Sequence, residues 1–489
     1  MHIVTVDRSG LAAWYRKNRA RSHALFDLIS EEAYYSQPIA LRHPIVFYEG
    51  HLPGFSFNTL VKKGLGRPSI DAKLEALFAR GIDPHEATAA APRESSGSRG
   101  TGGSAVLSET LAARERRVEG WPSRDVVHEF ADEADRQVLD ALEHGDIEQA
   151  GHPLLDRAEA AFTILEHEAM HQETLLYMWH RLPFDQKRLP PGYEPFADGG
   201  PLAADWMDVP AGCATLGVAR ESAPFTWDNE RSALSVQVDG FSIERHDVTN
   251  ERFLEFVDAG GYDNPELWKP EDWDWVQRER VAHPLFWERH DEGWHWRGMF
   301  GLIPLPMQWP VYVSHAEASA FARWRGARLP SEAEFQRAAF GSAEGERAHP
   351  WGSAAPAAAH GAFDFSSWDP HPVGAHPMGV SAWGVEDLVG NGWEWTSSIF
   401  GPFNTATWAK AVAGGTAWKG GTWMGNRMTG DGWTGTSWAS KTWAAATWTG
   451  TDWARQSWTD PTWNGRYWSG RYWSASYWAG SNWSSTRWR

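Results

Sequence analysis

The chain has little of what several protein classes require. Among its 489 residues there is a single cysteine, Cys213, so an internal disulfide framework and a cysteine-rich metal site are both excluded. No apolar run approaches the roughly 18 residues of a membrane-spanning helix, and the first residues lack the basic-then-apolar pattern of a secretory signal. The formal net charge of −18 argues against nucleic acid as a partner of the whole chain. We expect a cytoplasmic protein with no membrane span, in which Cys213 is a small buried residue.

The first part of the chain, residues 1–198, has the apolar pattern of helices. This pattern predicts helices over 11–32, 44–65, 123–143 and 154–181, with a kink near Pro53 and Gly54. Residues 91–108 are rich in Gly and Ser, which predicts a flexible loop. Four helices with apolar stripes indicate a four-helix bundle, whose core can hold a metal ion.

The sequence pattern changes from helical to mixed in residues 199–403. Strand-like runs over 214–218 and 234–243 alternate with Gly, Pro and Asn turns, and helices are expected over 250–257 and 315–325. Such a mixture predicts an α+β domain with much irregular structure, and thus a multidomain α+β chain.

Residues 404–489 form a third part, in which tryptophan recurs every five residues. Between Trp408 and Trp488, fifteen of the seventeen positions in this phase are Trp. This part carries a net charge of +6, whereas residues 1–403 carry −24. A period of five matches neither a helix nor a strand. We interpret the segment as a low-complexity tail that is disordered, with a five-residue solenoid as the alternative.

The strongest chemical signal is the pair His167 and His171. Residues four apart lie on one face of a helix, so the two rings can bind a single metal ion. With Glu168 the pair also matches the His-Glu-x-x-His pattern of zinc peptidases, in which the Glu is the general base. A downstream third ligand is then required, and Glu194 lies beyond the Pro-Pro-Gly turn at 190–192. The peptidase interpretation therefore stays an alternative.

A second segment supplies a third ligand by resemblance. Residues 42–55, Arg-His-Pro-Ile-Val-Phe-Tyr-Glu-Gly-His-Leu-Pro-Gly-Phe, resemble the second helix of the DinB-like bundle in iron(II)-dependent sulfoxide synthases of ergothioneine and ovothiol biosynthesis. The resemblance implies that His51, His167 and His171 bind Fe(2+). Met170 stands where the ergothioneine enzymes often offer a glutamine to the substrate, which implies a substrate-binding position.

The second domain resembles the formylglycine-generating-enzyme domain, also called the sulfatase-modifying-factor domain, which is C-type-lectin-like. The matching motifs lie at 209–212, 247–250, 328–334 and 390–396. Formylglycine chemistry is not implied, because those enzymes use a cysteine pair and this chain has only Cys213.

Together these resemblances imply an oxidoreductase with O2 as co-substrate. It would form a carbon–sulfur bond on the imidazole of hercynine, with a small thiol as the second substrate. A related branch takes a selenosugar and makes selenoneine. Residues 48–53 and 80–84 are similar to that branch. The residues leave the choice between sulfur and selenium open, and likewise the identity of the thiol.

The resemblance ends near residue 403. The closing segment of the family's second domain, with its catalytic tyrosine, has no counterpart here, and Tyr467, Tyr472 and Tyr477 of the repeat cannot be matched to it. Two interpretations follow. The tail is a genuine fusion, whose spaced aromatic rings suit a polysaccharide surface, or it is a frameshift product that leaves an incomplete second domain and an inactive enzyme.

Overall fold

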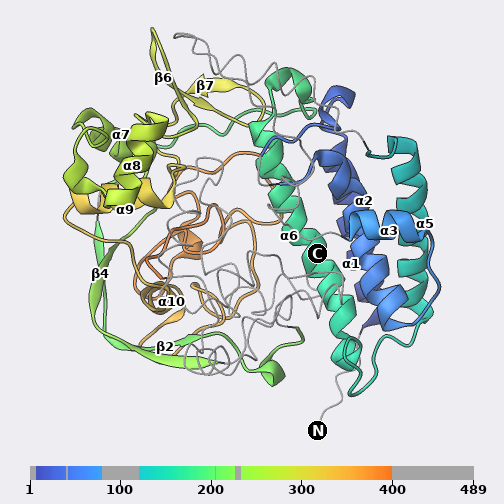
Figure 1. Ribbon diagram of the computed structural model, residues 1–489. Coiled ribbons are helices and arrows are strands. Elements are labelled where there is room, and N and C mark those ends of the chain that lie inside the picture. Colours follow the sequence, from blue (N-terminus) through green and yellow to red (C-terminus); the bar gives the residue numbers. More distant parts are fainter. Residues whose placement is uncertain (1–6, 40–41, 80–119, 204, 226–232, 399–489) are drawn as a thin grey trace. The chain divides into compact units, whose positions relative to one another are not determined.

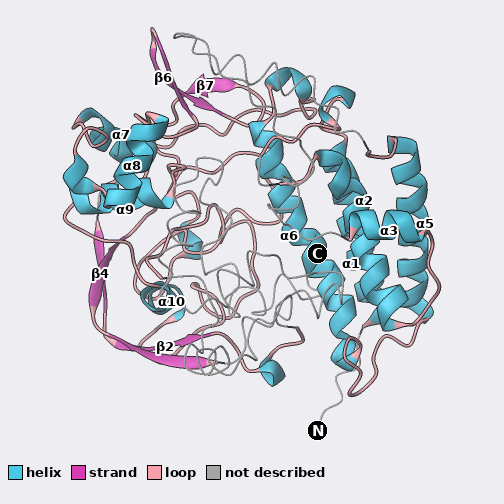
Figure 2. Cartoon of the chain, viewed as in Figure 1, coloured by secondary structure: helices cyan, strands magenta, loops and turns pink. Residues whose placement is uncertain are grey.

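The computed structural model describes residues 7–39, 42–79, 120–203, 205–225 and 233–398 (Figure 1). They form two compact units, one up to Pro190 and one from Pro191. The first unit is helical and the second mixes short helices, strands and loops (Figure 2). The predicted loop over 91–108 and the predicted tail over 404–489 lie outside the described residues.

The described residues of the first unit form a bundle of four long helices: α1 (Arg8–Phe26), α2 (Ile45–Ser56), α5 (Arg124–His144) and α6 (Glu159–Arg181). Helix α1 packs against α5 and α6, and α2 packs against the same two helices (Figure 1). A short helix, α3 (Ala72–Phe78), packs on α2. The predicted bundle is therefore present, and α3 was not foreseen.

The ends of these helices differ from the sequence-based ranges for local reasons. Helix α1 begins at Arg8 because the side chain of Asp7 accepts a hydrogen bond from the backbone N–H of Gly10. Pro53 does not end α2. Four residues after it, the chain continues as a π-helix, Phe57–Gly64. A proline removes one backbone donor from the helix interior, but the surrounding bundle keeps the helical path.

The described part of the second unit contains three small antiparallel sheets. Strands β1 (Trp206–Val209) and β4 (Phe241–Glu244) form the first, and β2 (Gly212–Leu216) and β3 (Leu234–Val238) the second. The third has the order β5–β6–β7 (Trp287–His290, Gly293–Arg297, Leu302–Pro304). The single strand expected over 234–243 is thus two strands, separated by Asp239 and Gly240.

Four helices complete the described part of this unit: α7 (Asn250–Asp258), α8 (Pro270–Glu279), α9 (His315–Trp324) and α10 (Glu332–Phe340). Helices α9 and α10 each begin at a capping box, Ser314 with Glu317 and Ser331 with Glu334. Predictions over 250–257 and 315–325 match α7 and α9, whereas α8 and α10 were missed. A large aromatic core joins α7, α8 and α9 to the third sheet through buried side chains that include Phe253, Phe256, Trp287, Trp296, Trp309 and Phe321.

The prediction for Cys213 is wrong. Its side chain is exposed on β2, where its thiol lies 3.5 Å from Oε1 of Gln237 on β3. Alternate residues of a strand face opposite sides. In β2 the inward positions belong to Ala214 and Leu216, which are buried, so Cys213 faces outward.

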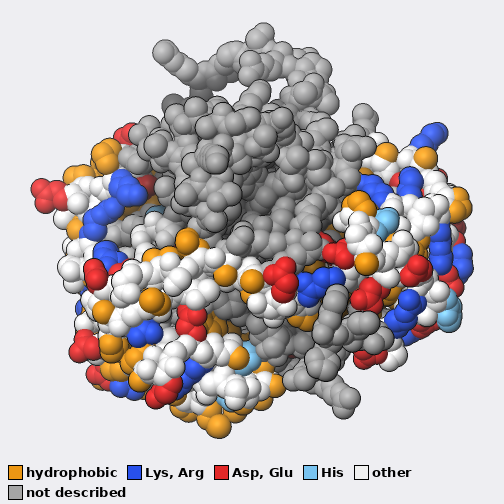
Figure 3. All heavy atoms as spheres, turned by 90° about the horizontal axis from the view of Figure 1, so that it is seen from below, with side chains coloured by type: hydrophobic (Ala, Val, Ile, Leu, Met, Phe, Trp, Pro, Cys, Tyr) orange, Lys and Arg blue, Asp and Glu red, His pale blue; other side chains and the backbone are white. Residues whose placement is uncertain are grey.

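In the part of the chain that the structure describes, no helix combines the length and the apolar character needed to cross a membrane. On the face drawn in Figure 3, acidic and basic side chains lie interspersed over the described residues.

Candidate metal centre

Helix α6 presents two histidines one turn apart. The rings of His167 and His171 have centroids 4.4 Å apart, and both side chains are buried. Almost every residue of α6 from Ala160 to Gln172 is buried, so this part of the helix lies inside the bundle. A helix that is buried on all sides is stabilised by packing against its neighbours.

Helix α2 brings the third histidine. Nε2 of His51 lies 3.2 Å from Nε2 of His167, and the centroid of its ring is 5.0 Å from those of both other rings. One ring nitrogen from each histidine can be chosen so that all three lie within 4.8 Å of one another. Within the described ranges this is the one group of three or more metal-binding side chains so arranged. The structure therefore brings together the three histidines proposed as ligands.

The three imidazoles are held neutral. Burial lowers the pKa of His51 to about 4, and it lowers the pKa of His167 and of His171 well below 6.5. Burial also raises the pKa of Glu166, the residue before His167, well above 4.5. A metal ion between the three rings would thus meet neutral nitrogen donors.

One hydrogen bond fixes the direction of the His51 ring. Its Nδ1 lies 2.6 Å from the backbone carbonyl oxygen of Phe78. Because a carbonyl only accepts, Nδ1 carries the proton, and the lone pair of a neutral ring is then on Nε2, the atom that faces His167. This is the arrangement in which a histidine binds a metal ion through one nitrogen while the other donates to the protein.

The fit of a cation can be tested on His167. Its Nδ1 is buried and has no hydrogen-bond partner among the described residues. If Nδ1 carries the proton, two lone pairs face each other across 3.2 Å. If Nε2 carries it, a buried acceptor is left unpaired. A cation between the rings removes the repulsion in the first case, so the donor set fits a divalent ion that prefers nitrogen ligands, such as iron or zinc.

Aromatic side chains of α2 line the histidines. Phe47 stacks on His51 with ring centroids 4.7 Å apart, and Phe55 stacks on His167 at 3.6 Å. The ring centroid of Tyr48 lies 5.6 Å from that of His171. These rings exclude water from the sides of the ligands and restrict their rotation. This role was not predicted, although Phe47, His51 and Phe55 follow one another at four-residue spacing and so lie along one side of the helix.

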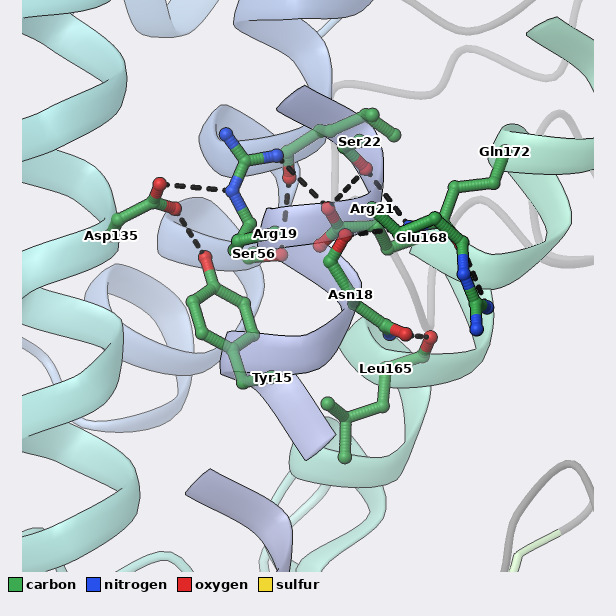
Figure 4. A network of polar contacts seen from close by, with 11 residues as sticks. Tyr15, Asn18, Arg19, Arg21, Ser22, Ser56, Asp135, Leu165, Glu168 and Gln172 are labelled. Atoms are coloured by element: carbon green, nitrogen blue, oxygen red, sulfur yellow. Dashed lines mark hydrogen bonds and ion pairs between the residues drawn. The ribbon is translucent and has the colours of Figure 1, made fainter. Parts of the chain in front are cut away.

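Two further positions on α6 were singled out in the sequence. Met170 lies beside the ligands and is partly exposed, so its role in substrate binding stays a prediction. Glu168 is fully buried and is directed at α1, where Oε1 accepts hydrogen bonds from Arg19 and Ser22 (Figure 4). A general base of a zinc peptidase has to reach water at the metal, and these contacts hold Glu168 elsewhere. The geometry therefore disfavours the peptidase interpretation.

The second unit contains a separate cavity of about 530 Å³. Aromatic side chains such as Trp206, Tyr312 and Trp393 line it together with charged ones. Among the latter, Glu334 and Arg328 form an ion pair. It contains no cluster of metal-binding side chains comparable to the three histidines within the described residues.

Fold and site together define a class: a helical bundle with a buried three-histidine centre, followed by an α+β domain. Comparison with known families agrees with both halves. The DinB superfamily matches residues 15–175, and the sulfatase-modifying factor enzyme 1-like domain matches residues 198–442. The second match extends beyond residue 403, where the end of this domain was expected. The domain boundary at residue 403 stays a prediction.

Similar proteins specify the family. The chain is 36% identical to the hercynine oxygenase of Mycolicibacterium smegmatis over 308 residues, which cover 56% of this chain and 70% of that protein. It is 35% identical to the hercynine oxygenase of Mycobacterium tuberculosis over 258 residues, or 49% of this chain and 56% of that protein. Ergothioneine biosynthesis protein 1 of Schizosaccharomyces pombe is 25% identical over 80% of this chain and 48% of its own length.

The chain therefore belongs to the family of sulfoxide synthases of ergothioneine biosynthesis. This confirms the predicted family and the predicted order of a DinB-like domain followed by a sulfatase-modifying-factor domain. It also supports the prediction of an oxidoreductase that acts on a small molecule.

Proposed function

We propose that this chain binds one ferrous ion through His51, His167 and His171 and uses dioxygen to join sulfur or selenium to the imidazole ring of hercynine. The observation that supports this proposal is the convergence of three neutral imidazoles, from two different helices, in a chain of this family. A ferrous ion held there would supply open coordination positions at which substrates and dioxygen meet.

The protein's own contribution is to orient and to shield. The carbonyl of Phe78 keeps the lone pair of His51 on Nε2, and the rings of Phe47 and Phe55 keep two ligands in place. Holding the ligands in a fixed geometry spares the reaction the free energy of arranging them. With no carboxylate ligand, the centre keeps a net positive charge, which favours an anionic thiolate or selenolate donor.

The test combines metal analysis with turnover. The chain is purified without oxygen, supplied with Fe(2+), and given hercynine and air with cysteine, γ-glutamylcysteine or a selenosugar in separate reactions. We expect about one iron per chain and a product in which the new atom is bonded to the imidazole, detected by mass spectrometry. The donor that reacts decides between the sulfur and the selenium branch.

Histidine variants provide the control. His51→Ala is expected to lose bound iron and turnover, whereas His144→Ala, at the exposed end of α5, is expected to keep both. Iron binding that survives His51→Ala contradicts the proposed site. Iron binding through the three histidines without product from any donor contradicts the proposed reaction and favours an inactive member of the family.

A further inference from the structure

One face of α6 is joined to α1 by directional contacts. Oε1 of Glu168 accepts a hydrogen bond from Nη1 of Arg19 at 2.9 Å and another from Oγ of Ser22 at 2.7 Å (Figure 4). One turn further along α6, Gln172 donates through Nε2 to the backbone oxygen of Asn18 at 2.7 Å. The side chains that make these contacts are all buried, so the hydrogen bonds are shielded from competition by water; they are Arg19, Ser22, Glu168 and Gln172.

The same network reaches a third helix. Nε of Arg19 donates to Oδ2 of Asp135 on α5 at 2.9 Å, and the hydroxyl of Tyr15 donates to Oδ1 of the same carboxylate at 2.6 Å (Figure 4). The guanidinium of Arg19 thus lies between a carboxylate of α5 and one of α6, and it links both helices to α1.

Helix geometry connects this network to the metal centre. Neighbouring residues point about 100° apart around a helix of 3.6 residues per turn. The side chain of Glu168 is therefore fixed relative to that of His167, and Gln172 relative to His171. A slip of α6 by one residue would turn both histidines away from α2 by the same angle. Apolar contacts tolerate small slips because they are not directional, whereas hydrogen bonds weaken steeply with angle.

We propose that Glu168 is a positioning residue of the metal centre. Its contacts with Arg19 and Ser22 hold α6 at the rotation at which His167 and His171 face His51. The inference rests on the proposed metal site. The Glu of the His-Glu-x-x-His pattern then takes no part in the reaction. Through its contacts with α1 it sets the direction of His167 and His171.

The decisive variant replaces both partners by methionine, Arg19→Met with Glu168→Met, in the full chain. Methionine fills a similar volume and removes both charges of the Arg19–Glu168 pair. Asp135 loses Arg19 as a partner, but it is 16% exposed and keeps the hydrogen bond from Tyr15, so the bundle is expected to fold. Metal binding is followed by anaerobic titration with Co(2+), whose visible absorption reports the coordination geometry. We expect an unfolding midpoint close to that of the wild type, an affinity for Co(2+) lower by at least about tenfold, and altered absorption bands.

Two single variants keep the test falsifiable if the double variant folds poorly. Glu168→Gln retains an oxygen that can accept from Arg19 and Ser22, so it is expected to bind Co(2+) within a few-fold of the wild type. Gln172→Leu removes the hydrogen bonds of Gln172 with Asn18, Ser22 and Arg21 without burying a charge, and it is expected to weaken Co(2+) binding several-fold. A control in the second unit, Tyr262→Phe, removes a buried hydrogen bond of 2.6 Å to Glu317 and is expected to lower stability alone.

The outcomes separate this inference from the proposed function. If the double methionine variant binds Co(2+) with the affinity and spectrum of the wild type, Glu168 has no positioning role. If His51→Ala leaves Co(2+) binding to the otherwise unchanged chain intact, the metal site itself is wrong, whatever the methionine variant does.

Discussion

Gly50, which precedes the proposed metal ligand His51 on α2, lies against the ring of Phe78. A Cβ atom at Gly50 would lie 2.4 Å from Cζ of Phe78 and 2.5 Å from two further atoms of that ring. Phe78 is fully buried, and its carbonyl oxygen is the acceptor for Nδ1 of His51. Gly50→Ala must therefore displace the buried ring of Phe78, and we expect the carbonyl of the same residue, the acceptor for His51, to shift with it.

The expected effect is a balance of two terms. Alanine gains about 1 kcal/mol of helix propensity over glycine. An overpacked core costs roughly 1–3 kcal/mol, and contacts of 2.4–2.5 Å with three ring atoms place this site in the upper part of that range, at about 2–3 kcal/mol. We expect Gly50→Ala to lower the free energy of unfolding by about 1–2 kcal/mol, measured by urea denaturation followed by circular dichroism. It should also weaken Co(2+) binding, because the acceptor for His51 moves.

The same helix offers a matched control. At Gly54 a Cβ atom would meet its nearest neighbour, Cε1 of Phe130, at 3.2 Å, so a small shift of that ring accommodates it. Gly54→Ala gains the same helix propensity of about 1 kcal/mol against a small packing cost. It should therefore leave the free energy of unfolding unchanged or raise it by up to about 1 kcal/mol. The reasoning is refuted if Gly50→Ala is as stable as the wild type, or if adding Phe78→Leu to Gly50→Ala fails to recover part of the loss in a double-mutant cycle.

Two further predictions concern stability. The pKa of the buried His51 is about 4 in the folded metal-free chain, against about 6.5 when unfolded, so the unfolded chain binds more protons between these pH values. The contribution of neutral His51 to the free energy of unfolding is therefore fully present above pH 6.5 and is lost as the pH falls towards 4. Between pH 7 and pH 5 this loss is about 2 kcal/mol. Urea midpoints of the metal-free wild type and of His51→Leu at both pH values measure it, and an equal pH dependence in the two would contradict it. Trp179→Ala empties a fully buried position on α6, where the indole N–H donates to the carbonyl of Leu25 at 2.8 Å, and should cost about 3–5 kcal/mol in the same assay. A loss below about 1 kcal/mol would show that this part of the bundle repacks freely.

Local patterns in the sequence were sufficient to predict most of the helical bundle. The helical period of apolar residues located α1, α2, α5 and α6. The four-residue spacing of His167 and His171 was enough to place two proposed ligands on one face of a helix. The Ser-x-x-Glu pattern at Ser331 was available as well and would have located α10.

Other features depend on contacts between distant parts of the chain. His51 and His167 are 116 positions apart, and no periodicity relates them, so only the resemblance to a family pointed to His51. Glu168 finds its partner Arg19 at a separation of 149 positions, which explains why its local pattern suggested a peptidase base instead. Cys213 was misassigned because the inward face of a strand is set by its pairing register, and a shift of one residue reverses it.

The exposure of Cys213 has a practical value. As the sole thiol of the chain, it accepts one nitroxide or fluorescent label at a defined position of the second unit without any mutagenesis. A paramagnetic ion bound at the three histidines would provide the second spin. Pulsed dipolar spectroscopy between the two would then measure the separation of the two units in solution, and repeating it with hercynine would show whether substrate draws them together.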